Sequence, residues 1–155
     1  MKYALVFFVY IFTFSLNAQN KPVYPEPKDG FKRVDLILPK VDHQENLNVE
    51  VKFAIEIELE NCESGSFSLY PNLPKEFFGI GNNRFPYYII EGNNVEYSVG
   101  RNSNCNGLKM KKMIYSSQEI TMSYQSSYAI PFYIPKNWNL VYRVWSTSDS
   151  YITVK

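Results

Sequence analysis

Residues 49–59 alternate between apolar and mostly charged side chains. The odd positions are all apolar, and they are Val49, Val51, Phe53, Ile55, Ile57 and Leu59. The even positions are four charged residues and one alanine, namely Glu50, Lys52, Ala54, Glu56 and Glu58. A strand turns successive side chains to opposite faces, whereas a helix would spread both sets around its surface. The segment is therefore predicted to be a β-strand with one face buried and the other in water.

Shorter segments of the same character recur along the chain. They are residues 34–38, 66–70, 87–90, 108–115, 120–124, 130–134 and 140–145. The stretches between them are rich in Gly, Pro and Asn, which form turns, and no segment shows a sustained period of 3.6 residues. The expected fold is all-β, an antiparallel β-barrel or sandwich of short strands with long surface loops.

The first 18 residues are typical of a secretory signal peptide. Lys2 is positively charged, residues 3–16 are apolar or aromatic apart from Thr13 and Ser15, and Ala18 is a small residue at the expected cleavage position. The apolar run is shorter than the roughly 20 residues that a membrane-spanning helix needs. We therefore expect removal of residues 1–18, a single mature domain of residues 19–155 without a membrane anchor, and a periplasmic or secreted location.

The charges of the chain are balanced, with 16 basic and 15 acidic side chains. One of the basic residues is Lys2, so the mature domain is expected to carry equal numbers of each sign. This balance argues against nucleic acid or an anionic membrane surface as the main partner. Lys109, Lys111 and Lys112 form a small basic cluster, which is interpreted as a solvated face.

Residues with catalytic or metal-binding chemistry are few. His43 is the only histidine, and it lies in a polar stretch that reads as a solvated loop, so a Ser-His-Asp or Cys-His arrangement is not expected. Glu56, Glu58 and Glu60 are predicted on the solvent face of their strand, where a glycosidase pair would not be activated. One histidine and two cysteines are too few ligands for a metal site. The sequence predicts a binding protein without enzymatic activity, cofactor or metal.

The two cysteines, Cys62 and Cys105, are both outside the signal peptide. An even pair in an oxidising compartment is most simply a disulfide, although two buried free thiols are the alternative. Closing a loop of this length would stabilise the fold by about 4 kcal/mol in the chain-entropy model.

Several ordered stretches resemble the ecotin family. They include Tyr24-Pro25, residues 30–33 and Tyr87-Tyr88 followed by Cys105. The strongest stretch is residues 124–145, where Tyr133, Pro135, Asn137 and the run Tyr142-Arg143-Val144-Trp145 have ecotin-like spacing without a gap. Cys62 also follows the long alternating strand, as the first cysteine does in that family. The resemblance covers essentially the whole mature chain.

The resemblance implies a periplasmic inhibitor of trypsin-fold serine proteases. Members of the family are mostly β-barrels, and they act as homodimers that exchange their C-terminal strands. One exposed loop enters the protease cleft like a substrate, and a disulfide ties that loop to a supporting loop. A second surface on two other loops lets the partner subunit bind the same protease.

By this resemblance, residues 97–104 form the loop that enters the protease. Its contact residues are Val99, Gly100, Arg101, Asn102, Ser103 and Asn104. Counting back from Cys105 gives Asn102–Ser103 as the reactive bond, with Asn102 in the S1 pocket. The stretch between Tyr88 and Cys105 is longer than in the family, and a shift of one residue would make Arg101–Asn102 the reactive bond.

The resemblance also assigns a second protease contact and a dimer arm. The second contact comprises Gly79, Ile80, Gly81, Ser123, Tyr124, Gln125, Ser126, Ser127 and Tyr128. Ile80 replaces an aromatic residue of the family, and the second of these segments lacks the family's basic residues. Trp145, Tyr151 and Ile152 fall on the exchanged arm, although Trp145 could instead belong to the core of a monomer.

The main alternative is an exported carbohydrate- or surface-binding β-sandwich that uses its many tyrosines as stacking platforms. The residues 99–104 discriminate between the two hypotheses. An inhibitor requires them to form an extended, protruding loop next to Cys105, whereas a binding module would include them in a flat aromatic face.

Overall fold

The computed structural model of the chain describes residues 24–80, 85–101 and 107–146. These residues form one short 3₁₀ helix, η1 (Gln44–Asn46), and ten strands. The strands are β1 (Phe31–Leu36), β2 (Leu47–Glu60), β3 (Glu63–Ser68), β4 (Lys75–Phe78), β5 (Pro86–Ile89), β6 (Glu96–Arg101), β7 (Lys109–Ser116), β8 (Ile120–Ser123), β9 (Ile130–Pro135) and β10 (Trp138–Ser146). The predicted all-β class is confirmed, and eight of the ten strands overlap predicted segments. Strands β4 and β6 were not predicted.

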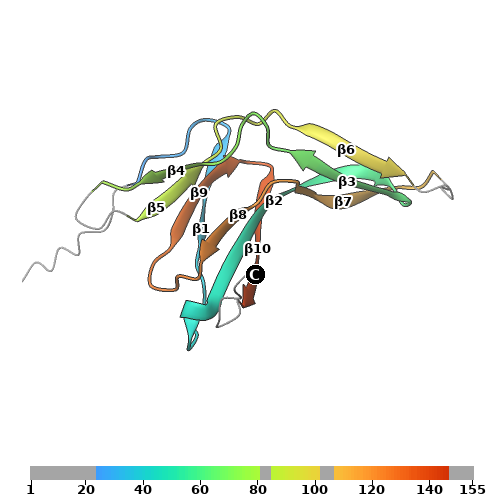
Figure 1. Cartoon of the computed structure of the whole chain (residues 1–155). Coiled ribbons are helices and arrows are strands. Elements are labelled where there is room, and N and C mark those ends of the chain that lie inside the picture. The colour runs from blue at the N-terminus through green and yellow to red at the C-terminus, as the bar shows by residue number, and fades with distance from the viewer. Residues whose placement is uncertain (1–23, 81–84, 102–106, 147–155) are drawn as a thin grey trace, which may run out of the picture.

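The described strands form two sheets (Figure 1). One sheet has four strands in the order β1-β9-β5-β4, and the other has six, in the order β10-β2-β7-β3-β6 with β8 also paired to β2. Of the two predicted architectures, barrel and sandwich, the described strands do not form a closed barrel, and the sheets are mixed rather than purely antiparallel. β5 pairs with β9 in parallel, and so does β3 with β7. Alternation within a strand identifies its buried face but says nothing of its partner's direction.

The core lies between the two sheets and is centred on large aromatic side chains. The Phe53 ring of β2 contacts the Phe132 ring of β9 with centroids 6.4 Å apart, which joins the six-stranded sheet to the four-stranded one. Trp138 packs on both Phe53 and Phe67, with centroids at 6.1 and 5.2 Å. All four side chains are buried. Such aromatic contacts bury large apolar areas, so they account for much of the packing energy between the sheets.

Strand β2 lies inside the six-stranded sheet, between β10 on one side and β7 and β8 on the other. Its odd residues are buried apart from the half-buried Leu47 and Ile57, and Glu56 and Glu58 are exposed, as predicted. The predicted solvent face is nevertheless wrong at Glu50 and Ala54, which are buried.

These two exceptions have local causes. Ala54 is a small side chain flanked in the ladder by Asn139 and Tyr115. Glu50 is covered from β10 by Arg143, which lies directly opposite it.

Candidate functional site

The segment expected to enter a protease begins as the edge strand β6. This strand pairs with β3 along its whole length, from Glu63 opposite Arg101 to Ser68 opposite Glu96. It is the last strand of its sheet, and all six of its residues are exposed. Val99, Gly100 and Arg101 therefore lie in a strand rather than in a loop. Asn102, Ser103 and Asn104 lie outside the described residues.

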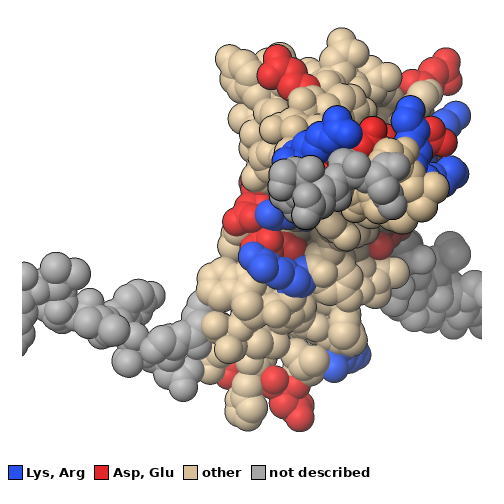
Figure 2. Space-filling view, turned by 90° about the vertical axis from the view of Figure 1, so that its right-hand side faces the viewer, with Lys and Arg blue, Asp and Glu red and all other residues tan. Residues whose placement is uncertain are grey.

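Arg101 is held by an acidic side chain of β2. Its Nη2 atom lies 2.7 Å from Glu60 Oε2, although more than half of the Arg101 side chain remains exposed. This ion pair directs the guanidinium of Arg101 towards β2. Figure 2 shows basic and acidic side chains interspersed on this end of the molecule rather than a patch of one sign.

The turn between β2 and β3 contains Cys62. Three of its neighbours fix the backbone: Glu60 N–H donates to the Glu63 carboxylate over 2.8 Å, and Asn61 N–H donates to the Leu108 carbonyl over 2.9 Å. Cys62 does not carry a free thiol. Its expected partner Cys105 lies outside the described residues, so the pairing of the two cysteines stays a prediction.

The interpretation of the lysine cluster on β7 is wrong for one of its three members. Lys109 and Lys111 are exposed as predicted, and Lys111 pairs with Glu56 over 2.9 Å. Lys112 is half-buried, and its amine donates to main-chain carbonyls of the β2–β3 turn. The sequence analysis missed the half-buried position of Lys112 because a lysine is usually interpreted as a surface charge. Its acceptors become apparent only when the strands next to β7 are known.

The structure brings together the two segments assigned to the second protease contact. Gly79 N–H donates to the Phe85 carbonyl over 3.0 Å, and the Phe85 ring stacks on Tyr128 with centroids 4.0 Å apart. Ile80 projects from this region with 78% of its surface exposed. Gly81 lies outside the described residues. The aromatic stack is the link that sequence analysis did not anticipate.

Within residues 123–128 the side chains differ in exposure. Ser123 and Ser127 are exposed, and Gln125, Ser126 and Tyr128 are half-buried. Tyr124 is buried, and its hydroxyl donates to the Pro39 carbonyl over 2.6 Å. Burial raises the pKa of the Tyr128 hydroxyl, and the charge of Glu76 adds to this effect. Tyr124 therefore anchors the segment to the core, and Ser123 and Ser127 are its solvent-exposed residues.

The C-terminal part of β10 is open to solvent. Trp145 lies opposite Asn48 in the ladder with β2 and is 43% exposed, so it is not part of the core. Tyr142 and Val144 are also exposed, although their ladder partners Val51 and Val49 face the core. Tyr151 and Ile152 lie outside the described residues.

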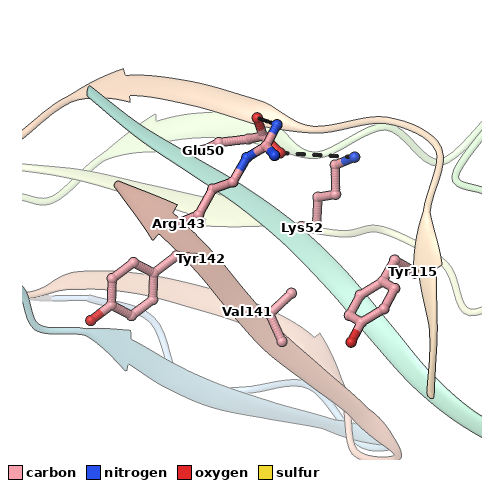
Figure 3. A pocket seen from close by; sticks show the side chains of 6 residues that line it. All are labelled: Glu50, Lys52, Tyr115, Val141, Tyr142 and Arg143. Atoms are coloured by element: carbon pink, nitrogen blue, oxygen red, sulfur yellow. Dashed lines mark hydrogen bonds and ion pairs between the residues drawn. The ribbon is translucent and has the colours of Figure 1, made fainter. Parts of the chain in front are cut away.

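A hollow of about 420 Å³ lies over β2 and β10 (Figure 3). In the strand order of the sheet, β10 and β6 are at opposite ends. The hollow is lined by Glu50, Lys52, Tyr115, Val141, Tyr142 and Arg143. The buried Glu50 carboxylate lies 2.5 Å from Arg143 Nη2 and 3.8 Å from Lys52 Nζ, and Lys52 also pairs with Glu119 over 3.2 Å. The charged groups of the hollow are thus paired with one another and with Glu119 beside it. Across residues 24–80, 85–101 and 107–146, no group of His, Cys, Asp and Glu could hold a metal ion.

Aromatic side chains also gather on the four-stranded sheet. Tyr87 contacts Tyr24 and Tyr133 edge-on, with interplanar angles of 74° and 73°, and stacks against Phe77. The Arg33 guanidinium lies 4.9 Å above the Tyr24 ring. Phe77 is exposed and lies at 23° to Tyr87, but Tyr87 is half-buried, Tyr133 is buried, and the Tyr24 and Tyr133 rings meet Tyr87 at steep angles. We interpret this aromatic cluster as side-chain packing on the four-stranded sheet rather than as a sugar-binding platform.

His43 is exposed, as predicted, and its Nδ1 atom lies 3.2 Å from Glu45 Oε1. None of the helices in the described part of the chain has the length and apolar character needed to span a membrane.

Comparison with known proteins gives consistent matches over most of the chain. The ecotin family model matches residues 20–147. An ecotin-like protein of Methylobacillus flagellatus is 26% identical over 137 residues, which cover 87% of this chain and 81% of that protein. Ecotin of Pseudomonas fluorescens is 26% identical over 139 residues, which cover 88% of this chain and 83% of that protein.

Proposed function

This chain belongs to the ecotin family, and from that membership we propose that it inhibits trypsin-fold serine proteases by presenting a substrate-like segment to their active-site cleft. The observation that carries the proposal is the edge strand β6. It has no strand partner on its outer side among the described residues, and it leads directly to the expected reactive bond. A protease binds its substrate in extended form through backbone hydrogen bonds, and a strand edge offers those groups.

We propose Asn102–Ser103 as the reactive bond, with Asn102 in the S1 pocket. The rival assignment, Arg101–Asn102, would place the Arg101 side chain in that pocket. Arg101 would then have to leave its 2.7 Å ion pair with Glu60. Residues of one protein that already pair with each other must be separated before they bind a partner, and this separation reduces affinity. The ion pair therefore favours Asn102.

We propose a disulfide between Cys62 and Cys105 as the tether of this segment. A flexible peptide that enters a protease is cut and released. A tether beside the reactive bond lowers the ordering cost on binding and keeps the two cleaved ends together, so religation competes with release. The position of Cys62 next to Glu63, which lies opposite Arg101 in the sheet, supports this arrangement.

The second contact would come from the partner subunit. Figure 1 shows that β6 ends at one end of the molecule and that β4, which leads to Ile80, lies at the other. One subunit is therefore poorly shaped to place both surfaces on one protease. A dimer formed by exchange of the C-terminal strands, with Trp145, Tyr151 and Ile152 on the exchanged arm, would supply both, and two contacts raise the effective concentration of each.

Ecotin-family proteins are periplasmic. We propose that this chain reaches the same compartment through removal of residues 1–18, and that residues 19–155 form the inhibitor.

The proposal is tested by titrating active-site-calibrated trypsin, chymotrypsin and elastase with the refolded mature protein. Stoichiometric loss of activity against at least one of them is the expected result. Full activity of all three in the presence of excess folded protein would contradict the proposal.

A further inference from the structure

Lys112 contacts the backbone on both sides of Cys62. Its Nζ atom donates to the Asn61 carbonyl over 2.8 Å and to the Glu63 carbonyl over 2.7 Å. The neighbouring Lys111 instead points into solvent, with 71% of its side chain exposed. Two short bonds from one ammonium group to the carbonyls that flank Cys62 fix the turn more strongly than neutral hydrogen bonds would.

The topology explains why this turn needs a donor from elsewhere. β2 and β3 follow each other in sequence, yet they are not neighbours in the sheet, because β7 lies between them. The two strands diverge from the turn, so they cannot satisfy each other's backbone groups as the strands of a hairpin do. Lys112 comes from β7, between the diverging strands, and supplies the missing donors.

The same turn supports the last described residue before the proposed reactive bond. Glu63 lies opposite Arg101 in the β3–β6 ladder, and Glu60 pairs with the Arg101 side chain. In the same turn, Asn61 N–H donates to the carbonyl of Leu108, the residue just before β7. Both described flanks of residues 102–106 are therefore anchored to the backbone that Lys112 holds.

We propose that Lys112 is a positioning residue for inhibition, which keeps the β2–β3 turn rigid so that the reactive segment is held for religation instead of being hydrolysed. This inference rests on the proposed function. A support for a binding segment has to be fixed to a rigid element of the fold, and β7 is an interior strand with neighbours on both sides. Lys112 itself touches neither the reactive bond nor, in this proposal, the protease.

The test compares the mature wild-type protein with Lys112→Met, which keeps an unbranched apolar stem and removes the ammonium group. Lys111→Met is the matched control, because Lys111 is the adjacent residue and its ammonium group pairs with the exposed Glu56 side chain rather than with the turn. Each variant is incubated with the protease that wild type inhibits. Inhibition is followed for several hours, and cleavage of the segment is measured by mass spectrometry.

We expect Lys112→Met to be cleaved on the order of tenfold faster than wild type, with inhibition lost over time. Lys111→Met should behave like wild type, and Lys112→Arg should restore lasting inhibition because guanidinium also donates to two acceptors. Lasting inhibition and a wild-type cleavage rate for Lys112→Met would overturn the proposal, even if its melting temperature fell. If Lys112→Met does not fold, Lys112→Gln is compared with wild type and Lys111→Met in the same way.

Amide hydrogen exchange tests the positioning role of Lys112 separately from the proposed inhibition of proteases. The amides of residues 60–64 should exchange faster in Lys112→Met than in Lys111→Met, without any protease present. Unchanged exchange would refute the contact itself. A wild-type protein that inhibits no serine protease would refute the proposed function and the positioning role together, whatever the exchange shows.

Discussion

Glu50 and Arg143 lie directly opposite each other in the β2–β10 ladder, and Arg143 Nη2 donates a 2.5 Å hydrogen bond to Glu50 Oε2. The Glu50 side chain is nearly buried, whereas most of the Arg143 side chain is exposed. The hydrogen bond from Arg143 lowers the pKa of Glu50, and the positive charges of Arg143 and Lys52 add to this effect. The pair fastens the edge strand β10 to the interior strand β2.

The lowered pKa of Glu50 predicts a pH-dependent contribution to stability. The folded state favours the carboxylate, so the contribution is complete above the ordinary pKa of 4.5 and is lost as the pH falls through the lower folded-state value. Glu50→Gln should therefore reduce the free energy of unfolding at pH 7, and this reduction should be smaller at pH 3. Urea unfolding at the two pH values checks this. Glu56→Gln, at an exposed position of the same strand, is the control. An equal loss at both pH values would show that packing, and not charge, stabilises this site.

The reactive residue is tested by substitution. If Asn102 occupies S1, Asn102→Arg should create trypsin inhibition, because the buried carboxylate of a trypsin-like S1 pocket requires a cation. The gain should be at least about a hundredfold in the inhibition constant. Arg101→Ala should leave inhibition of an elastase-like enzyme nearly intact. Loss of existing trypsin inhibition in Arg101→Ala, with little effect of Asn102→Ala, would move the reactive bond to Arg101–Asn102.

The disulfide is predicted to form in exported protein. A non-reduced digest should contain one linked peptide pair with Cys62 and Cys105, detected by mass spectrometry. The double variant Cys62→Ser/Cys105→Ser should lose about 4 kcal/mol of unfolding free energy in the chain-entropy model. It should also be hydrolysed by a protease that the wild type inhibits. Two free thiols in periplasmic material would exclude the tether.

The C-terminal arm is predicted to hold the dimer. Deleting residues 148–155 removes Tyr151, Ile152 and Val154, and the remaining protein should sediment as a monomer. The exposed Tyr142, Val144 and Trp145 on β10 are the surface that such a dimer would cover. Sedimentation velocity over a range of concentrations gives the measurement. A truncated protein that remains dimeric at the wild-type concentration would place the interface elsewhere.

The accuracy of the sequence analysis varied with the burial of each strand. The long strand β2 was predictable because its apolar and charged residues alternate in the sequence, and the other predicted strands were found as short apolar or aromatic runs between turn-forming residues. β4 and β6 were missed because every residue of each is exposed, so neither carries a buried face to produce a pattern. Partner direction was not predictable either, because parallel and antiparallel pairs use the same alternation.

Individual side chains at the site depended on contacts between distant segments. Glu50 appeared to be on the solvent face because its covering residue, Arg143, comes from the far end of the sequence. Lys112 appeared to be one of three equivalent surface lysines because its acceptors are main-chain carbonyls, which no sequence pattern marks. The stack of Phe85 on Tyr128 likewise connects the regions around residues 79–81 and 123–128. The sequence analysis identified these two segments but not the contact between them.

The pairing of β1 with β9 has a consequence for the order of folding. β1 is the first strand, and its described ladder is with β9 alone, which in turn separates it from β5 and β4. The four-stranded sheet therefore lacks the strand that joins β1 to the β5–β4 pair until residues 130–135 have left the ribosome. Long-range pairing of this kind folds slowly, since the intervening chain must first be brought together. A nascent chain built this way keeps its first strand without its sheet partner for most of its synthesis.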